Sequence, residues 1–310
     1  MAITDTPPAT APSNTVSRAG KAATRPKRRI KWEPIIDHTV LIFGSLLMLF
    51  PVVLTFMTSS YDKLAFSKTG LQFGWSDKFL ENYNRAMFEA GGFTGTIDGM
   101  TMLTNSMILG LGFAIGKIII SMLAAYAIVY FRFRFATFSF WVIFTTLLLP
   151  LEVRILPSYE VVQSFGLANT YTGLIVPLIA SATGTFFFRQ FFRSVPEEMV
   201  EAARMDGAGP VKFFIDILVP LSKTMIAAIF IIMFVFGWNQ YLWPTLITTE
   251  EGMFTLVRGI KQIIQAFTDS NVVPEFTVGL ALTIITMLPP VIIVVIFQSW
   301  FVKGLVESDK

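Results

Sequence analysis

The sequence contains no cysteine and only one histidine, His38. The absence of cysteine excludes disulfide bonds, thiolate nucleophiles and cysteine-ligated zinc or iron–sulfur centres. A single histidine excludes a histidine-rich metal site and argues against a Ser-His-Asp triad. These absences point away from most metal-dependent and nucleophilic enzymes.

Charged residues are scarce as well. Asp, Glu, Lys and Arg make up 15% of the 310 residues, whereas soluble globular proteins contain about 25%. Hydrophobic residues make up 54%, and the mean hydropathy is +0.64. The chain has too few charges to cover a water-facing surface, so we predict an all-α protein that crosses a membrane several times.

Basic residues gather at the N-terminus. Residues 1–31 contain seven lysines and arginines and one acid, Asp5, which gives +6 and leaves −3 for the other 279 residues. A basic segment can bind nucleic acid, but no nucleic-acid-binding pattern accompanies this one, which is rich in Pro, Ala, Thr and Ser. We predict a disordered cytoplasmic tail over residues 1–33 and a membrane domain over residues 34–310, with no nucleic-acid partner.

Six segments are long and apolar enough to span a bilayer, which takes about 20 residues. They are residues 39–61, 100–131, 135–151, 161–188, 224–249 and 276–302. Basic residues flank them on one side: Arg132 and Arg134 after the second, Arg189 and Arg193 after the fourth, and Lys303 after the sixth. Basic flanks are typically cytoplasmic, so both termini are expected there. On the outer side, residues 253–267 have the apolar spacing of a surface-lying amphipathic helix.

The connection between the fourth and fifth segments, residues 194–223, has the pattern of a short cytoplasmic helix. Ser194 and Glu197 have the spacing of a capping box. Gly207, Gly209 and Pro210 should end the helix after about three turns.

This connection resembles the EAA loop of the permeases of ABC importers. Three residues separate the triplet at 201–203 from Gly207, and nine more precede an I-x-L-P element, in which Val219 replaces the Leu. In that family the loop forms a coupling helix, seated in a groove of a separate ATPase. The resemblance therefore implies coupling roles for Glu201, Ala202, Ala203, Asp206, Gly207, Ile217 and Pro220.

Further blocks extend the resemblance to essentially all of residues 35–310. Residues 116–133, 149–162, 180–192 and 237–244 are similar to carbohydrate-uptake permeases of the maltose type, and most of all to permease subunits for sn-glycerol-3-phosphate and related glycerophosphodiesters. The resemblance implies a six-span permease in the bacterial inner membrane. It also implies a homologous second permease, two copies of an ABC ATPase and a periplasmic solute-binding protein as partners.

The chain itself is not expected to hydrolyse ATP. Its nearest approach to a P-loop is Gly116-Lys117, but the motif requires Gly at 111 and Ser or Thr at 118, where the chain has Leu111 and Ile118. We therefore expect a non-catalytic pore subunit without a cofactor or metal, with ATP and Mg²⁺ bound by the partner ATPase.

Several polar residues within or beside the spans are candidate substrate contacts. A phosphate that crosses a bilayer needs fixed cations or helix N-termini. Lys117 lies near mid-span, where a lysine costs at least about 2.5–3.5 kcal/mol, so it either attracts the phosphate or pairs with a carboxylate or carbonyl across the subunit interface. Glu152 and Arg154 form either an external gate or dock, or a local ion pair.

The run GWNQYLWP leaves two interpretations open. Asn239, Gln240 and Tyr241 place hydrogen-bonding groups in an apolar span and could contact substrate in the pore. Alternatively, Trp238, Tyr241 and Trp243 form an aromatic belt at the outer interface. For the protein as a whole, the alternatives are a permease for a neutral sugar such as a disaccharide, and a self-contained secondary carrier, which would leave the coupling loop unexplained.

Overall fold

The structure is a computed structural model that describes residues 32–89, 97–131, 133–269 and 275–307. Every regular element in these ranges is helical, which confirms the all-α prediction. Residues 1–31 of the predicted tail and Arg132 lie outside the described residues. Trp32 and Glu33, which were predicted to belong to the tail, are instead the first residues of a helix. The chain divides into two compact units, residues 1–48 and 49–310. The described part of the first unit is the N-terminal portion of helix α1 (Trp32–Thr58).

Three helices are long and apolar enough to cross a membrane unbroken: α1, α4 (Gly99–Tyr130) and α15 (Phe276–Glu307). Three further candidates are bent pairs. The first pair joins α5 (Ala136–Thr145) and the short turn η1 (Thr146–Leu148) to α6 (Leu151–Ser164). The second pair joins α7 (Tyr171–Ile175) and η2 (Val176–Leu178) to α8 (Ala182–Ser194). The third pair joins residues 210–221 to α12 (Lys223–Trp238). If each pair is one span, length and composition allow six, as predicted.

The bends correct three of the predicted span boundaries. Residues 135–151 do not form one helix, because the chain turns by 106° around Pro150. Residues 161–188 are not continuous either: α6 ends at Ser164, and Gly166 (φ 66°) and Asn169 (φ 53°) reverse the chain before α7. The segment 224–249 breaks after Trp238 and resumes as α13 (Leu242–Ile247). Hydropathy alone cannot detect these breaks, because the residues that make them are few and the flanking apolar runs merge.

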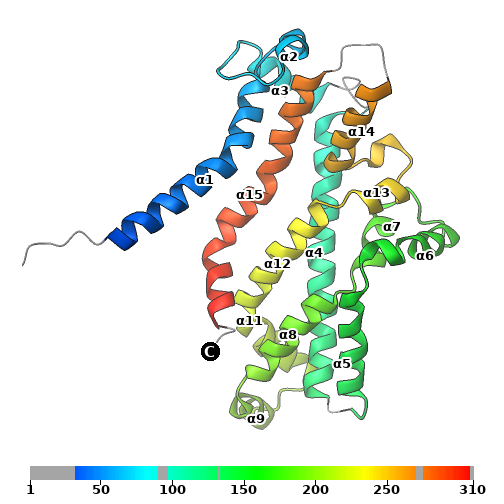
Figure 1. Cartoon of the computed structure of the whole chain (residues 1–310). Helices are drawn as coiled ribbons and strands as arrows, with labels where there is room; N and C mark the ends of the chain where they lie inside the picture. Colours follow the sequence, from blue (N-terminus) through cyan, green and yellow to red (C-terminus); the bar gives the residue numbers. More distant parts are fainter. Residues whose placement is uncertain (1–31, 90–96, 132, 270–274, 308–310) are drawn as a thin grey trace, which may run out of the picture. The chain divides into compact units, whose positions relative to one another are not determined.

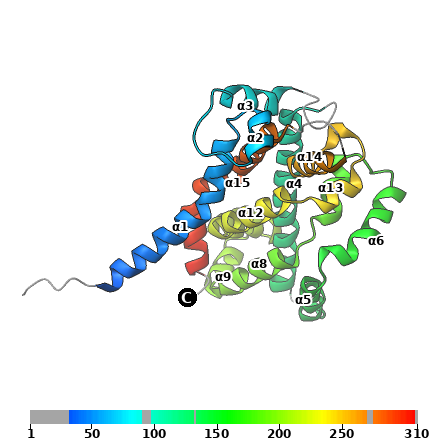
Figure 2. The same ribbon diagram turned by 45° about the horizontal axis from the view of Figure 1, so that its top comes forward.

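Helix α4 is the centre of the second unit. It packs against α8 and α12, and α12 packs in turn against α15 (Figures 1 and 2). Two glycines of α4 permit close packing, because a Cβ on Gly112 would lie 2.5 Å from Ile175 and one on Gly116 would lie 2.7 Å from Ile179. The helices after α6 therefore approach α4 at the level of Lys117.

Figure 1 shows shorter helices at the two ends of this bundle. One end carries α2 (Lys63–Thr69), α3 (Phe79–Phe88), α13 and α14 (Leu256–Asp269). Glu275, before α15, pairs there with Lys63 at 2.7 Å and Arg85 at 3.3 Å. Most of the segment predicted to be an amphipathic helix forms α14, which begins at Leu256 and packs against α4 and α15. Its place on the outer surface of the membrane stays a prediction. The opposite end carries α9 (Glu197–Met205).

Candidate functional site

Helix α9 is the short helix predicted within residues 194–223, and its end is set by local sequence. Gly207 adopts φ 74°, the left-handed conformation that glycine tolerates. The N–H of Gly207 donates to the Arg204 carbonyl at 3.0 Å, and that of Ala208 donates to the Ala203 carbonyl at 2.9 Å. This pair of bonds is a Schellman motif. Gly207 therefore ends α9 where the sequence indicated.

The predicted start of α9 is wrong. Ser194 is the last residue of α8, and its hydroxyl donates to the Phe191 carbonyl at 2.7 Å. The N-cap residue of α9 is Pro196, which has no side-chain hydrogen bond to offer. The capping-box spacing fails because Ser194 still belongs to the preceding helix, a tertiary outcome that local spacing does not reveal.

The two faces of α9 differ. Ala203 is buried, and together with Val200 it lines an apolar cavity of about 240 Å³ against Tyr126 and Phe213. The other residues of α9 are exposed, as is its C-cap residue: Glu197, Glu198, Met199, Glu201, Ala202, Arg204, Met205 and Asp206. Met205 is 83% exposed, which is unusual for a large apolar side chain. The exposed part of α9 thus combines several carboxylates with one arginine, two methionines and one alanine.

Two tyrosines of α4 hold the chain on either side of α9. The Tyr130 hydroxyl donates to the Phe192 carbonyl at 3.1 Å, before α9, and the Tyr126 hydroxyl donates to the Pro210 carbonyl at 2.9 Å, after it. Neither tyrosine was singled out from the sequence. The available signal was their spacing of four at the end of an apolar span, which places both on one helix face.

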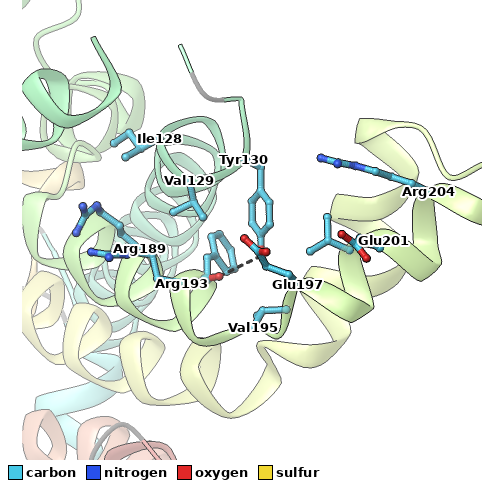
Figure 3. A pocket seen from close by; sticks show the side chains of 11 residues that line it. Ile128, Val129, Tyr130, Arg189, Arg193, Val195, Glu197, Glu201 and Arg204 are labelled. Atoms are coloured by element: carbon cyan, nitrogen blue, oxygen red, sulfur yellow. Dashed lines mark hydrogen bonds between the residues drawn. The ribbon is translucent and has the colours of Figure 1, made fainter. Parts of the chain in front are cut away.

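A cavity of about 410 Å³ lies between the ends of α4 and α8 and the start of α9 (Figure 3). Figure 3 shows Tyr130 between Arg189 and Arg193 on one side and Glu201 and Arg204 on the other. Arg189 lies over the Phe140 ring, 3.9 Å from its centroid. Glu201 therefore faces both the solvent and a hollow rich in arginine.

The remaining coupling residues lie beyond α9. Residues 210–221 form a continuous helical run, with α10 (Pro210–Lys212), the π-helix η3 (Phe213–Leu218) and α11 (Val219–Leu221). Ile217 packs against the hydrophobic core, whereas Pro220 is exposed. A π-helical turn is uncommon and often marks a functional site. The run bends by 75° into α12, so α9 joins the bundle through α8 at one end and this bend at the other.

Lys117 lies in a third cavity, of about 510 Å³, among α4, the α5–α6 bend, α8 and α12. Its ammonium donates to the Ala180 carbonyl at 3.3 Å, and it lies 4.5 Å from the centroid of the Phe113 ring. The carbonyl-pairing alternative is therefore observed, but within the chain. Arg154 lines the same cavity, so the structure brings two of the candidate residues together.

Three hydroxyl residues at the start of α8 complete the cavity wall: Ser181, Thr183 and Thr185. Ser181 is the N-cap, and its hydroxyl accepts from the Gly184 N–H at 3.2 Å. These residues were not predicted to contact substrate, although Ser and Thr before an apolar run are a recognised helix-start signal.

The other candidates are not lining residues of this cavity. Glu152 is exposed, and the ion pairs found among the described residues do not include one with Arg154. The side chains of Asn239 and Gln240 bond back to the carbonyls of Val235 and Phe236. These two residues and Tyr241 lie in the break between α12 and α13, not inside a helix, which corrects that prediction.

The aromatic-belt alternative is also wrong for both tryptophans. Trp238 is 1% exposed and donates to the Thr286 carbonyl, and Trp243 is fully buried and donates to the Leu174 carbonyl. Both serve as packing residues with satisfied indole N–H groups. Tyr241 instead lies beneath Lys261, whose ammonium is 4.2 Å from the ring centroid.

Comparison with known proteins decides the family. Residues 117–307 match the model of the family described as "binding-protein-dependent transport system inner membrane component". The chain belongs to this family. It is a multi-pass permease of the inner membrane. A binding-protein-dependent importer of this kind combines a permease with an ATPase, a second permease and a solute-binding protein.

Curated relatives extend the match along the chain. The chain is 45% identical over 276 residues to "sn-glycerol-3-phosphate transport system permease protein UgpE" of Brucella melitensis, covering 89% of this chain and 97% of that protein. It is 47% identical over 279 residues to the protein of the same name in Agrobacterium fabrum, with the same coverage.

A solved structure shows the same fold. It is a chain of a bacterial ABC transporter involved in the import of the acidic polysaccharide alginate, with a TM-score of 0.73 and 20% identity. The match covers 89% of this chain and all of that one. The permease fold predicted from the sequence is therefore confirmed.

Proposed function

We propose that this chain is one permease subunit of an ATP-driven importer of sn-glycerol-3-phosphate, with related glycerophosphodiesters as further substrates. Relatives that match nearly their whole length carry that substrate in their names. The observation that carries the substrate class is the pair of cations, Lys117 and Arg154, on one cavity of the bundle. A phosphate monoester is an anion, and fixed cations are what it needs within a membrane.

We further propose that α9 is the coupling helix and that both termini are cytoplasmic. The exposed face of α9 is short, rigidly capped at Gly207 and acidic at Glu201. A carboxylate on such a face can make a charge-assisted hydrogen bond to a basic group of an ATPase. Because α9 is tied to α4 by two tyrosines, closure of two ATPase copies would move the bundle as a unit. ATP hydrolysis belongs to the partner.

The substrate is tested with the complete complex in proteoliposomes, supplied with its binding protein. sn-Glycerol-3-phosphate should stimulate ATP hydrolysis, and a neutral disaccharide should not. If the disaccharide stimulates and sn-glycerol-3-phosphate does not, the substrate proposal is wrong and the neutral-sugar alternative replaces it. Uptake that continues after the ATPase gene is deleted would instead favour a secondary carrier.

A further inference from the structure

We propose that the 510 Å³ cavity beside α4 is a phosphate subsite of the translocation pathway, in which Lys117 and Arg154 hold the substrate phosphate against the first turn of α8. The identity of the substrate rests on the proposed function. The new element is that this chain, through these residues, contacts the phosphate itself. A cavity of this size lies within the range of about 300–1,000 Å³ typical of small-molecule sites.

Lys117 has unused hydrogen-bonding capacity. The side chain is buried, at 6% exposure, and an ammonium has three donors. One donor reaches the Ala180 carbonyl at 3.3 Å, and the other close groups are the faces of Phe113 and Phe236, with centroids at 4.5 Å and 5.7 Å. A buried cation with one long hydrogen bond and two ring faces is poorly compensated, so an anion within reach would be strongly favoured.

The charge in the cavity is unbalanced. Arg154 adds a second positive charge to the same wall, and the described lining residues include no Asp or Glu. Neither cation takes part in an ion pair found in the part of the chain that the structure describes. Arg154 is exposed, whereas Lys117 is buried, so the lysine carries the larger desolvation cost. A bound anion would attract both cations.

The remaining polar groups of the wall suit a phosphate. Ser181, Thr183 and Thr185 place hydroxyls on the cavity. The Thr185 hydroxyl already donates to the Ser181 carbonyl at 2.8 Å, which leaves the hydroxyls of Ser181 and Thr183 to donate to phosphate oxygens. They begin α8, a helix of 13 residues whose N-terminus adds partial positive charge. The helix terminus is a supplement here, because the buried lysine and the second cation already select an anion.

The position of α8 gives the subsite a mechanical consequence. The helix begins at the cavity and ends at Ser194, and only two residues separate it from the start of α9 at Glu197. The substrate phosphate and the coupling helix therefore sit at opposite ends of one helix. A phosphate that draws Lys117 away from the Ala180 carbonyl would release the segment that leads into α8.

The experiment measures import into proteoliposomes by the full complex, with its binding protein saturated. Lys117→Gln and Arg154→Gln should each slow import of sn-glycerol-3-phosphate at least about tenfold, because each removes a charged hydrogen bond. Import of a glycerophosphodiester, which carries one negative charge less, should slow by a smaller factor. Lys117→Arg should recover more activity than Lys117→Gln. The control is Lys68→Gln, an exposed lysine of α2.

Several results would overturn the subsite. If Lys117→Gln and Arg154→Gln both import sn-glycerol-3-phosphate at the wild-type rate, the subsite proposal is wrong. The proposed function still stands in that case, because the wild-type complex imports the same substrate. Equal slowing of both substrates, with less assembled complex, would make Lys117 a structural residue. Loss of a co-purifying phospholipid from Lys117→Gln, with import unchanged, would assign the cavity to a lipid headgroup. If Lys117→Gln fails to assemble, Arg154→Gln and Thr183→Val decide the question by the same substrate comparison.

Discussion

The segment around α9 and the cavity beside α4 use charge in different ways. Glu201 lies on an exposed face, where water screens its carboxylate. Lys117 is buried among phenylalanine rings with one carbonyl bond. An exposed charge costs little until a partner covers it, whereas a buried cation is costly until an anion arrives. The α9 segment is thus suited to docking a protein, and the cavity is suited to holding a small anion.

The largest effect is expected at the docking face. Glu201→Lys should reduce transport at least about tenfold, because reversing a charge in a desolvated interface costs about 2–5 kcal/mol. Membrane insertion should be unaffected, because the side chain is exposed. The measurement is substrate uptake by cells, with the amount of membrane-inserted chain quantified alongside. Glu201→Gln keeps the shape of the side chain, so its uptake should lie between that of the wild type and that of Glu201→Lys. Normal uptake by Glu201→Lys would contradict the coupling role.

The end of α9 allows a matched comparison of two glycines. Gly207→Val forces a branched side chain into φ 74°, which costs about 1–2 kcal/mol or more, so uptake should fall about tenfold. Gly209→Val is the control, because Gly209 has an extended conformation (φ −70°, ψ 169°) and open space around its Cβ position. Equal uptake by the two variants would show that the left-handed turn is not required.

The tyrosine bonds should give an intermediate effect. Tyr126→Phe and Tyr130→Phe each remove one hydrogen bond, worth about 1 kcal/mol, and keep the ring packing. Substrate-stimulated ATP hydrolysis should fall by about two- to fivefold in each variant and further in the double variant. No loss even in the double variant would mean that α4 does not transmit motion through these bonds.

The smallest effect is expected at Asn239, a residue that sequence analysis ranked as a pore candidate. Its amide bonds back to the Val235 carbonyl at 2.9 Å, and the cavity is lined by other residues. Asn239→Leu should therefore change the import rate by less than about twofold, as is usual for an exposed substitution away from a site. A loss as large as that expected for Lys117→Gln would place the substrate path at the α12–α13 break instead.

How much the sequence predicts depends on how local each feature is. The end of α9 follows from Gly207 and its neighbours, and the span count follows from hydropathy. The cavity could not be predicted as a unit, because Lys117 and Arg154 lie on different helices and come to line one cavity only through the bend between α5 and α6. The sequence shows the hydroxyl residues at the start of α8, but it does not show that they line one cavity with Lys117 and Arg154.

Two of the misplaced boundaries show where a local pattern fails. Residues 161–188 read as one uncharged run, although a reversal at Gly166 and Asn169 divides them. Ser194 has the spacing of a cap but remains inside α8. Asn169 bonds to Ile247 and Thr249, far along the chain, and a local pattern cannot show such contacts. The hydroxyl of Ser194 bonds back to Phe191 within α8, so the capping spacing was matched without a cap.

The most direct test of the account uses the absence of cysteine, which makes any introduced thiol unique in the chain. Glu201→Cys, treated with a thiol-specific photo-cross-linker in the assembled complex, should capture the ATPase subunit, and the yield should change when the ATPase closes on nucleotide. A membrane-impermeant thiol reagent added outside intact cells should leave the residue unlabelled. Labelling from outside, or the absence of any cross-link to the ATPase, would contradict the assignment of α9 as the coupling helix.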